Sequence, residues 1–386
     1  MAGFDRQVSL PNAKTRPVGR LGFLDALRGL AVLLVLFQHV GELTWSVVPE
    51  VSGNWLDIGQ LGVMLFFCCS GFIIPVSLER TGRLDTFWIS RFFRLYPLYW
   101  FSLAGAFVCS QLFDIPTAAV TTADWLANIT MLQHFLGRPD AVGLYWSLAW
   151  EMAFYLLITV LFLLHAHRRP VLLSAAINTC LLAAVLLYWL FLPGKHFSVG
   201  LFNIALMFAG YAVHQWFVGK VATSVIVTTV GYTALTGVVI LLTTTFSGGL
   251  TDQIGVPRSA LPLGTAWLGA LLIFTVVVAS ARSGLRFPAW LRRLGTISFS
   301  VYLMQSLVVA GIEVPAAPPW LVAVIWTTAT LLISELTYRF LEVPAIKLGH
   351  RTVRSRPRTT SVSGVEPPTI SSPPRKKPAE HFSSTG

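Results

Sequence analysis

The stretch LGFLDALRGLAVLLVLFQHVGE, residues 21–42, decides the fold class because it is long and apolar enough to cross a bilayer as a helix. A transmembrane helix needs about 20 predominantly apolar residues. Nine further runs of this kind follow, so the sequence predicts about ten transmembrane helices. The predicted spans lie near residues 21–42, 57–79, 95–113, 145–165, 171–192, 199–218, 222–246, 262–281, 295–314 and 319–345.

The composition of the whole chain agrees with a membrane protein. Of its 386 residues, 54% are hydrophobic and only 12% are charged, and the mean hydropathy is +0.68. A soluble globular domain carries about 25% charged residues, so the composition excludes a cytosolic enzyme, a disordered regulator and a disulfide scaffold. The four cysteines lie inside apolar runs without metal-ligand spacing, which predicts small buried side chains and no metal site. They are Cys68, Cys69, Cys109 and Cys180.

The basic residues indicate how these spans are oriented. If the N-terminus is cytoplasmic, 24 of the 28 Lys and Arg residues fall on the cytoplasmic side and only three fall in outer loops. This asymmetry follows the positive-inside rule. It predicts an all-α polytopic membrane protein with both termini cytoplasmic, and it explains the net charge of +11 without a nucleic-acid partner.

The segments outside the spans divide the chain further. Residues 1–20 are predicted to be a cytoplasmic N-terminal segment, and residues 21–349 a single transmembrane domain. Residues 350–386 are rich in Pro, Ser and Arg and predict a disordered, basic cytoplasmic tail. Asp85–Phe93 mixes aromatic residues with arginine, which is typical of a helix lying at the membrane interface, and residues 121–136 are similar on the opposite side.

Two basic residues stand inside the first span. Arg28 and His39 are eleven residues apart, so they lie on nearly the same helical face and about 16 Å apart along the axis. A buried arginine is costly unless it is paired or faces a wet cavity, which predicts an internal polar site along this face. The alternative is that Arg28, assisted by Asp25, and His39 extend toward the two membrane surfaces.

The same residues belong to a wider pattern of motifs. The Arg28-x10-His39 arrangement is followed by GVMLFFCCSGFII (62–74), FWISRFFRLYPLYW (87–100), YWSLAWEMAFYLL (145–157), ISFSVYLMQ (297–305) and TYRFLEVPAIKLG (337–349). In kind and order they resemble the motifs of the acyltransferase-3 family of integral membrane acyltransferases. The motif FWISRFFRLYPLYW includes an R-x-x-R pair, Arg91 and Arg94. One departure is Gln305, which stands where the family often has a histidine and cannot serve as an acid or base near neutral pH.

The resemblance implies an enzyme that transfers a short acyl group, of acetyl to isovaleryl size, to a sugar or polyketide hydroxyl. It implies acyl-CoA as the donor substrate and no bound cofactor. The composition is typical of a GC-rich actinobacterial gene, so a bacterial plasma membrane and a macrolide antibiotic acceptor in secondary metabolism are favoured slightly. A cell-surface polysaccharide or a lipid-linked saccharide is the alternative acceptor, and the oligomeric state stays open.

Physical reasoning assigns roles within this scheme. Arg91 and Arg94 share a helical face and, with Arg28, are predicted to bind the phosphates of acyl-CoA; the alternative is anchoring to lipid phosphates. His39 is the predicted general base, and Glu151 is predicted to orient it, unless that carboxylate forms a structural ion pair elsewhere.

The remaining predictions concern the acceptor and a rival function. Trp146 and Ser147 are predicted to bind the acceptor near the outer surface, although Trp146 also fits an aromatic belt at the interface. The rival hypothesis is a proton-coupled transporter or exporter, in which Arg28, His39 and Glu151 form a proton relay.

Overall fold

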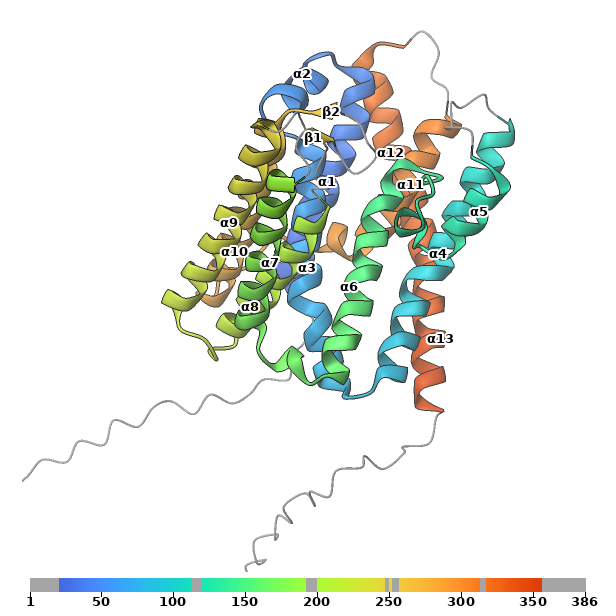
Figure 1. The fold of residues 1–386 in the computed structure, drawn as a ribbon. Helices are drawn as coiled ribbons and strands as arrows, with labels where there is room; N and C mark the ends of the chain where they lie inside the picture. The colour runs from blue at the N-terminus through green and yellow to red at the C-terminus, as the bar shows by residue number, and fades with distance from the viewer. Residues whose placement is uncertain are drawn as a thin grey trace, which may run out of the picture.

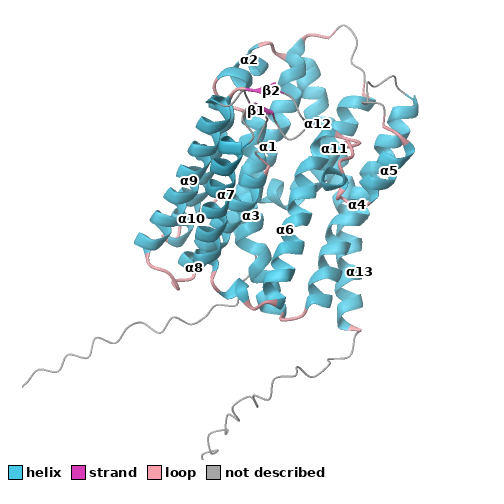
Figure 2. Ribbon diagram, in the orientation of Figure 1, coloured by secondary structure: helices cyan, strands magenta, loops and turns pink. Residues whose placement is uncertain are grey.

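Long helices make up most of the computed structural model (Figures 1 and 2), which describes residues 21–112, 120–191, 200–246, 250–251, 257–312 and 317–355. The longer helices are α1 (Gly22–Thr44), α3 (Ile58–Thr81), α4 (Leu84–Leu112), α6 (Trp146–Leu163), α7 (Pro170–Phe191), α8 (Leu201–Phe217), α9 (Thr223–Phe246), α10 (Ala260–Arg282), α11 (Ala289–Gly311), α12 (Pro319–Thr337) and α13 (Val343–Arg354). The shorter elements are α2 (Val47–Asn54), α5 (Thr122–Ile129), the 3₁₀ turns η1 (Gln133–Leu136), η2 (Gly143–Tyr145) and η3 (Ala166–Arg168), a π-helical turn η4 (Tyr338–Glu342) and an antiparallel ribbon of β1 (Leu250–Thr251) and β2 (Pro257–Arg258).

Each of the ten predicted spans coincides with a helix. Within the described residues, nine helical stretches are long and apolar enough to cross a membrane, and α8, at 17 residues, is slightly shorter than these. The prediction of an all-α polytopic membrane protein is confirmed. The cytoplasmic placement of the termini stays a prediction. Residues 1–20 and 356–386 lie outside the described residues, and α13 remains helical to Arg354, past the predicted start of the tail.

Two segments continue a spanning helix instead of standing apart from it. The predicted interfacial segment Asp85–Phe93 is the first part of α4, which runs unbroken for 29 residues through Pro97. No turn-forming residue separates the segment from the span, so the helix propagates. At the other end of the chain, α12, η4 and α13 form one continuous helical rod, with the π turn between its two α-helical parts.

The centre of the bundle is formed by α1 and α3. Helix α1 packs most extensively against α11 and α3, while α3 also packs against α8 and α10. Glycines permit this close approach: a Cβ at Gly295 would lie 1.6 Å from the backbone oxygen of Asp25, and one at Gly71 would lie 1.8 Å from that of Met207. Figure 1 shows α7, α8, α9 and α10 on one side of this centre and α4, α6 and α13 on the other.

Short elements cover one end of the bundle. Helices α2 and α5 and the β1–β2 ribbon lie at this end, whereas α13 ends at the opposite one (Figure 1). The segment that follows α5 is held by Asn128, whose amide donates to the backbone oxygens of Asp124 (2.8 Å) and Pro139 (3.0 Å). Burial raises the pKa of Asp140 in the same segment, and a hydrogen bond from Gln133 opposes this shift. We refer to this end as the outer end and to the opposite one as the inner end.

Candidate active site

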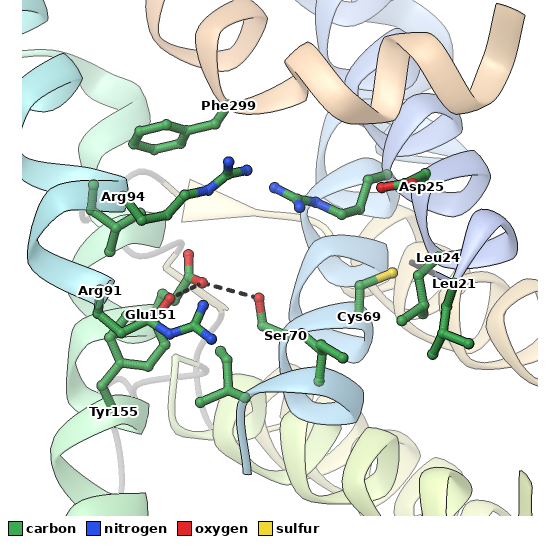
Figure 3. A pocket seen from close by; sticks show the side chains of 14 residues that line it. Leu21, Leu24, Asp25, Cys69, Ser70, Arg91, Arg94, Glu151, Tyr155 and Phe299 are labelled. Carbon is green, nitrogen blue, oxygen red and sulfur yellow. Dashed lines mark hydrogen bonds between the residues drawn. The ribbon is translucent and has the colours of Figure 1, made fainter. Parts of the chain in front are cut away.

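A polar pocket of about 230 Å³ lies between α1, α3, α4, α6 and α11 (Figure 3). Its polar and charged lining consists of Asp25, Arg28, Cys69, Ser70, Arg91, Arg94, Glu151 and Tyr155. The structure therefore brings together four of the residues singled out from the sequence: Arg28, Arg91, Arg94 and Glu151. Figure 3 shows Arg91, Arg94 and Glu151 on one side of the pocket, opposite Asp25 and Leu24.

Helical spacing explains how three helices supply these groups. Asp25 and Arg28 are three residues apart on α1, Arg91 and Arg94 are three apart on α4, and Glu151 precedes Tyr155 by four on α6. Residues three or four apart lie on one face of a helix, so each helix presents two polar side chains to the same cavity. The pocket is thus built into the helical register and does not depend on loops.

The Glu151 carboxylate forms the best-defined contacts in the pocket. Its Oε1 atom accepts a hydrogen bond from the Ser70 hydroxyl at 3.1 Å and another from the Tyr155 hydroxyl at 2.7 Å. Ser70 stands at the middle of α3, so the carboxylate lies deep within the bundle. The sequence does not assign Ser70 or Tyr155 to the site. The spacing of four residues between Glu151 and Tyr155 on α6 was an available signal for Tyr155, whereas Ser70 lies on α3 and is brought to Glu151 only by packing.

The predicted contact between Glu151 and His39 does not occur among the described residues. Glu151 instead lines the pocket with Arg28, while His39 stands eleven residues further along α1, about 16 Å toward the outer end. The prediction assumed that α6 begins at the outer surface. In the structure the turn before α6 is already buried, with Tyr145 packed against Tyr99, so α6 starts inside the bundle and carries Glu151 to the level of Ser70.

Arg91 is held by protein groups on three sides. Its Nη2 donates to the Ser77 hydroxyl at 3.0 Å, and its guanidinium carbon lies 5.5 Å from the ring centroid of Phe87 and 5.6 Å from that of Tyr155. Such contacts fix the plane of a guanidinium. They orient Arg91 toward the pocket that it lines and not toward surrounding lipid.

Arg94 forms an ion pair that was not foreseen from the sequence. Its Nη1 lies 2.7 Å from Oε1 of Glu342, whose side chain is fully buried, and the other carboxylate oxygen of Glu342 accepts from the Ser300 hydroxyl at 2.8 Å. The signal that could have found Glu342 was a lone carboxylate within the apolar motif TYRFLEVPAIKLG.

His39 lies apart from the pocket, near the outer end of α1. Its Nδ1 is 2.8 Å from the backbone oxygen of Val35. A carbonyl oxygen can only accept, so the Nδ1 atom carries the hydrogen and the neutral ring keeps its lone pair on Nε2. The ring is partly buried, and this tautomer is the one that can take a proton at Nε2.

Two valines separate Arg28 from His39 on the same face of α1. Val32 and Val35 follow Arg28 by four and seven residues, so they project along the line that joins the two basic side chains. Both are fully buried. The described part of the first helix thus carries a polar inner site, an apolar layer about two turns long and an outer histidine.

The predicted acceptor residues, Trp146 and Ser147, make their described contacts with neighbouring side chains and backbone at the start of α6. Trp146 makes an edge-to-face contact with Phe67, with ring centroids 6.1 Å apart. Ser147 is buried, and its hydroxyl bonds to the Tyr302 hydroxyl at 2.6 Å and the Leu144 backbone oxygen at 3.1 Å. Neither residue lines the pocket. Gln305 is also buried, and its amide donates to the backbone oxygen of Tyr302.

The three guanidinium groups of the pocket suit an anionic ligand by their geometry. They face the carboxylates of Asp25 and Glu151 within a partly apolar wall, and Glu342 pairs with Arg94 from outside the lining, so the site carries no large net positive charge. Guanidinium groups bind phosphate oxygens with two parallel hydrogen bonds, which suits them to a phosphorylated ligand. Within the described ranges, no three His, Cys, Asp or Glu residues are grouped so that they could hold a metal ion.

Comparison with known proteins places these features in a family context. Residues 21–339 match the profile of the acyltransferase-3 family, described as an acyltransferase domain. The chain is 27% identical over 359 residues to the peptidoglycan O-acetyltransferase OatA of Listeria monocytogenes, covering 84% of this chain and 56% of that protein. It is 25% identical over 372 residues to the O-acetyltransferase OatA of Staphylococcus aureus, covering 88% of this chain and 59% of that protein.

A third relative matches a shorter region. The acyltransferase MdmB of Streptomyces mycarofaciens is 30% identical over 148 residues, covering 36% of this chain and 38% of that protein. The chain therefore spans less than two thirds of the length of each of these three relatives. No solved structure matches it. Because the family profile covers most of the sequence, including every helix that lines the pocket, the chain belongs to the acyltransferase-3 family of integral membrane acyltransferases.

Proposed function

We propose that the protein is an acyl-CoA-dependent O-acyltransferase that transfers a short acyl group to a hydroxyl of a cell-surface saccharide. The observation that carries the proposal is the pocket at the inner end of the bundle, where three arginines converge beside an apolar wall. Membership of the acyltransferase-3 family supports acyl transfer as the reaction class.

The inner pocket suits the phosphate-bearing part of an acyl-CoA donor. Arg28, Arg91 and Arg94 would bind its phosphate oxygens, while Leu21, Leu24 and the other apolar lining residues would contact the pantetheine arm. The volume of about 230 Å³ is below the range of about 300–1,000 Å³ typical of small-molecule sites, so the cavity holds only part of such a donor. In the orientation predicted from the basic residues, this pocket faces the cytoplasm, where acyl-CoA is made.

His39 would act as the general base at the opposite end of α1. Its Nε2 lone pair takes the proton of the acceptor hydroxyl while that oxygen attacks the thioester carbonyl. The new ester bond forms as the carbon–sulfur bond breaks, the CoA thiolate leaves, and the proton held at Nε2 passes to the thiolate, directly or through water. The hydrogen bond from Nδ1–H to the Val35 backbone oxygen holds the neutral ring in the tautomer whose Nε2 can accept this proton.

The separation of the pocket from His39 sets a condition on this mechanism. With the phosphates of the donor bound in the pocket, its thioester must extend about 16 Å along α1, past Val32 and Val35, to reach His39. Both valines are fully buried in the structure. We infer that the pantetheine arm passes between these valines and the helices that cover them, which requires the apolar layer to open when the donor binds.

A surface saccharide is the better-supported acceptor. Two of the relatives that match most of this chain are named as O-acetyltransferases, and one name specifies peptidoglycan. The macrolide acceptor favoured slightly from the composition has weaker support, since the Streptomyces relative matches only 36% of the chain and is named simply as an acyltransferase. Acetyl is accordingly the first acyl group to test.

The experiment is incubation of membranes containing the protein with labelled acetyl-CoA and candidate saccharides, including peptidoglycan fragments and a macrolide. Free CoA and labelled ester are measured, with membranes lacking the protein as the control. The proposal predicts CoA release matched by ester formation on a saccharide. Movement of a substrate across the membrane without CoA release would instead support the rival transporter hypothesis.

A further inference from the structure

A buried carboxylate stands just behind the pocket and has no part in the mechanism above. Glu342 is the last residue of the π turn η4, and its side chain is fully buried. Burial of an ionised carboxylate is costly unless it is paired and hydrogen-bonded. Single π turns within helical rods occur often at functional sites, which directs attention to what this residue contacts.

The contacts of Glu342 tie together three parts of the bundle. One oxygen lies 2.7 Å from Nη1 of Arg94 on α4, and the other accepts the Ser300 hydroxyl of α11 at 2.8 Å. One oxygen is therefore ion-paired with Arg94 without accepting a hydrogen bond, and the other accepts a hydrogen bond from Ser300, so turning the carboxylate would disturb both contacts. The ion pair with Glu342 also holds the Arg94 guanidinium on the side that faces away from the pocket.

Arg94 is nevertheless open on its other side. Its side chain is 25% exposed and lines the pocket together with Arg28 and Arg91. A guanidinium carries five N–H donors in one plane, so pairing at Nη1 leaves others available to a ligand. Arg91 is oriented by Ser77 and two aromatic rings, whereas the described ion pair of Arg94 is with Glu342 alone.

An ion pair elsewhere on the same rod provides a comparison. Glu335 on α12 pairs with Arg293 and Arg339, but both arginines are at least 46% exposed, and none of the three lines the pocket. Such surface pairs contribute little to stability. The buried Glu342–Arg94 pair differs from the Glu335 pairs because its arginine lines the pocket.

We propose that Glu342 is a positioning residue for the donor: it holds Arg94 so that the free N–H groups of its guanidinium meet an anionic group, namely a phosphate of the acyl donor. The inference rests on the proposed function and adds to it a residue that touches no substrate. Ser300 supports the carboxylate from α11. Without the negative charge of Glu342, the Arg94 side chain is still present, but its guanidinium group can rotate away from the pocket.

The test is steady-state kinetics of the full-length protein in proteoliposomes, with acetyl-CoA varied at saturating acceptor. Glu342→Gln is expected to raise KM for acetyl-CoA about tenfold or more, in line with loss of the buried charge that pairs with Arg94, while kcat changes little. Glu342→Asp is expected to recover part of the loss. In an Arg94→Gln background, Glu342→Gln is expected to add almost nothing, because the two residues act through one contact.

Two further variants keep the inference falsifiable. Glu335→Gln is the matched control on the same rod and is expected to leave KM unchanged. Ser300→Ala removes one hydrogen bond but keeps the ion pair, so it tests the arrangement even if Glu342→Gln fails to fold; a KM increase of about two- to fivefold is expected. An unchanged KM in a folded Glu342→Gln variant, or in Ser300→Ala if that variant alone folds, would overturn the inference.

These outcomes also separate this inference from the proposed function. If the wild-type protein releases no CoA, the proposed function fails and the inference falls with it. If the wild-type protein is active and additive losses appear in the double variant, Glu342 acts on stability or on another residue, and only the positioning role is contradicted.

Discussion

The two ends of α1 carry one basic side chain each, and the bundle surrounds them differently. At the inner end Arg28 shares a pocket with two further arginines, two carboxylates and the hydroxyls of Ser70 and Tyr155. At the outer end His39 has its described hydrogen bond with the backbone of its own helix. Val32 and Val35 lie between them. An elaborate charged site suits recognition of a large anionic donor, whereas a single oriented imidazole suits proton transfer.

The largest expected effect comes from removing the outer group. His39→Ala should lower the rate of acyl transfer about 10²- to 10⁴-fold, because a general base contributes on this scale. KM for acetyl-CoA should stay close to the wild-type value, since the inner pocket is untouched. Measurement of kcat and KM in proteoliposomes checks both points. Activity within a few-fold of wild type would remove His39 from the mechanism.

The next effect concerns the layer between the two ends. Val35→Phe should reduce transfer about 10²-fold by obstructing the path of the thioester, while CoA binding at the inner pocket persists. Overpacking also costs about 1–3 kcal/mol of stability, so thermal unfolding must be followed in parallel. Val35→Ala is the control, and it should keep most of the activity. Equal activity of the Val35→Phe variant and the wild-type protein would mean that the thioester takes another path.

A somewhat smaller effect is expected at the inner end. Arg28→Gln removes one of three guanidinium groups, and KM for acetyl-CoA should rise about ten- to hundredfold with a modest change in kcat. Isothermal titration with CoA checks the same loss without turnover. If kcat falls and CoA affinity does not, then Arg28 acts on the reaction and the division between the two ends is wrong.

The smallest effect tests the corrected place of Glu151. Glu151→Gln keeps an oxygen that accepts from Ser70 and Tyr155 but loses the negative charge that faces the arginines. A change of about two- to tenfold in KM is expected, and the pH profile of kcat should not move. A shift in that profile would show that Glu151 does act on His39, as the sequence first suggested.

Much of the fold follows from the sequence, because long apolar runs have few stable alternatives in a bilayer. All ten predicted spans are helical, and helical spacing correctly indicated that Arg91 and Arg94 share a face. The depth of each side chain within the bundle was harder to predict. The early start of α6 depends on the burial of Tyr145 against Tyr99, a tertiary contact, and this displaced Glu151 from His39 to the arginines.

Glu342 shows a second limit of sequence reasoning. The motif around it also holds Arg339 and Lys347, so the sequence does not distinguish its carboxylate from a charge at the end of a span. The π turn that carries it leaves no mark in the periodicity of the side chains. Its partners Arg94 and Ser300 lie more than 200 and about 40 residues away in sequence, and only packing of α4, α11 and η4 brings them together.

The division of roles between the two ends of α1 is tested most directly by offering the donor to one face at a time. The protein is reconstituted in sealed vesicles of determined orientation, acetyl-CoA is added outside, and CoA release is measured with acceptor on the opposite face. Release is predicted only where the donor meets the face at which α1 begins and α13 ends. Equal release from both faces, or release only from the face covered by α2 and α5, would contradict it.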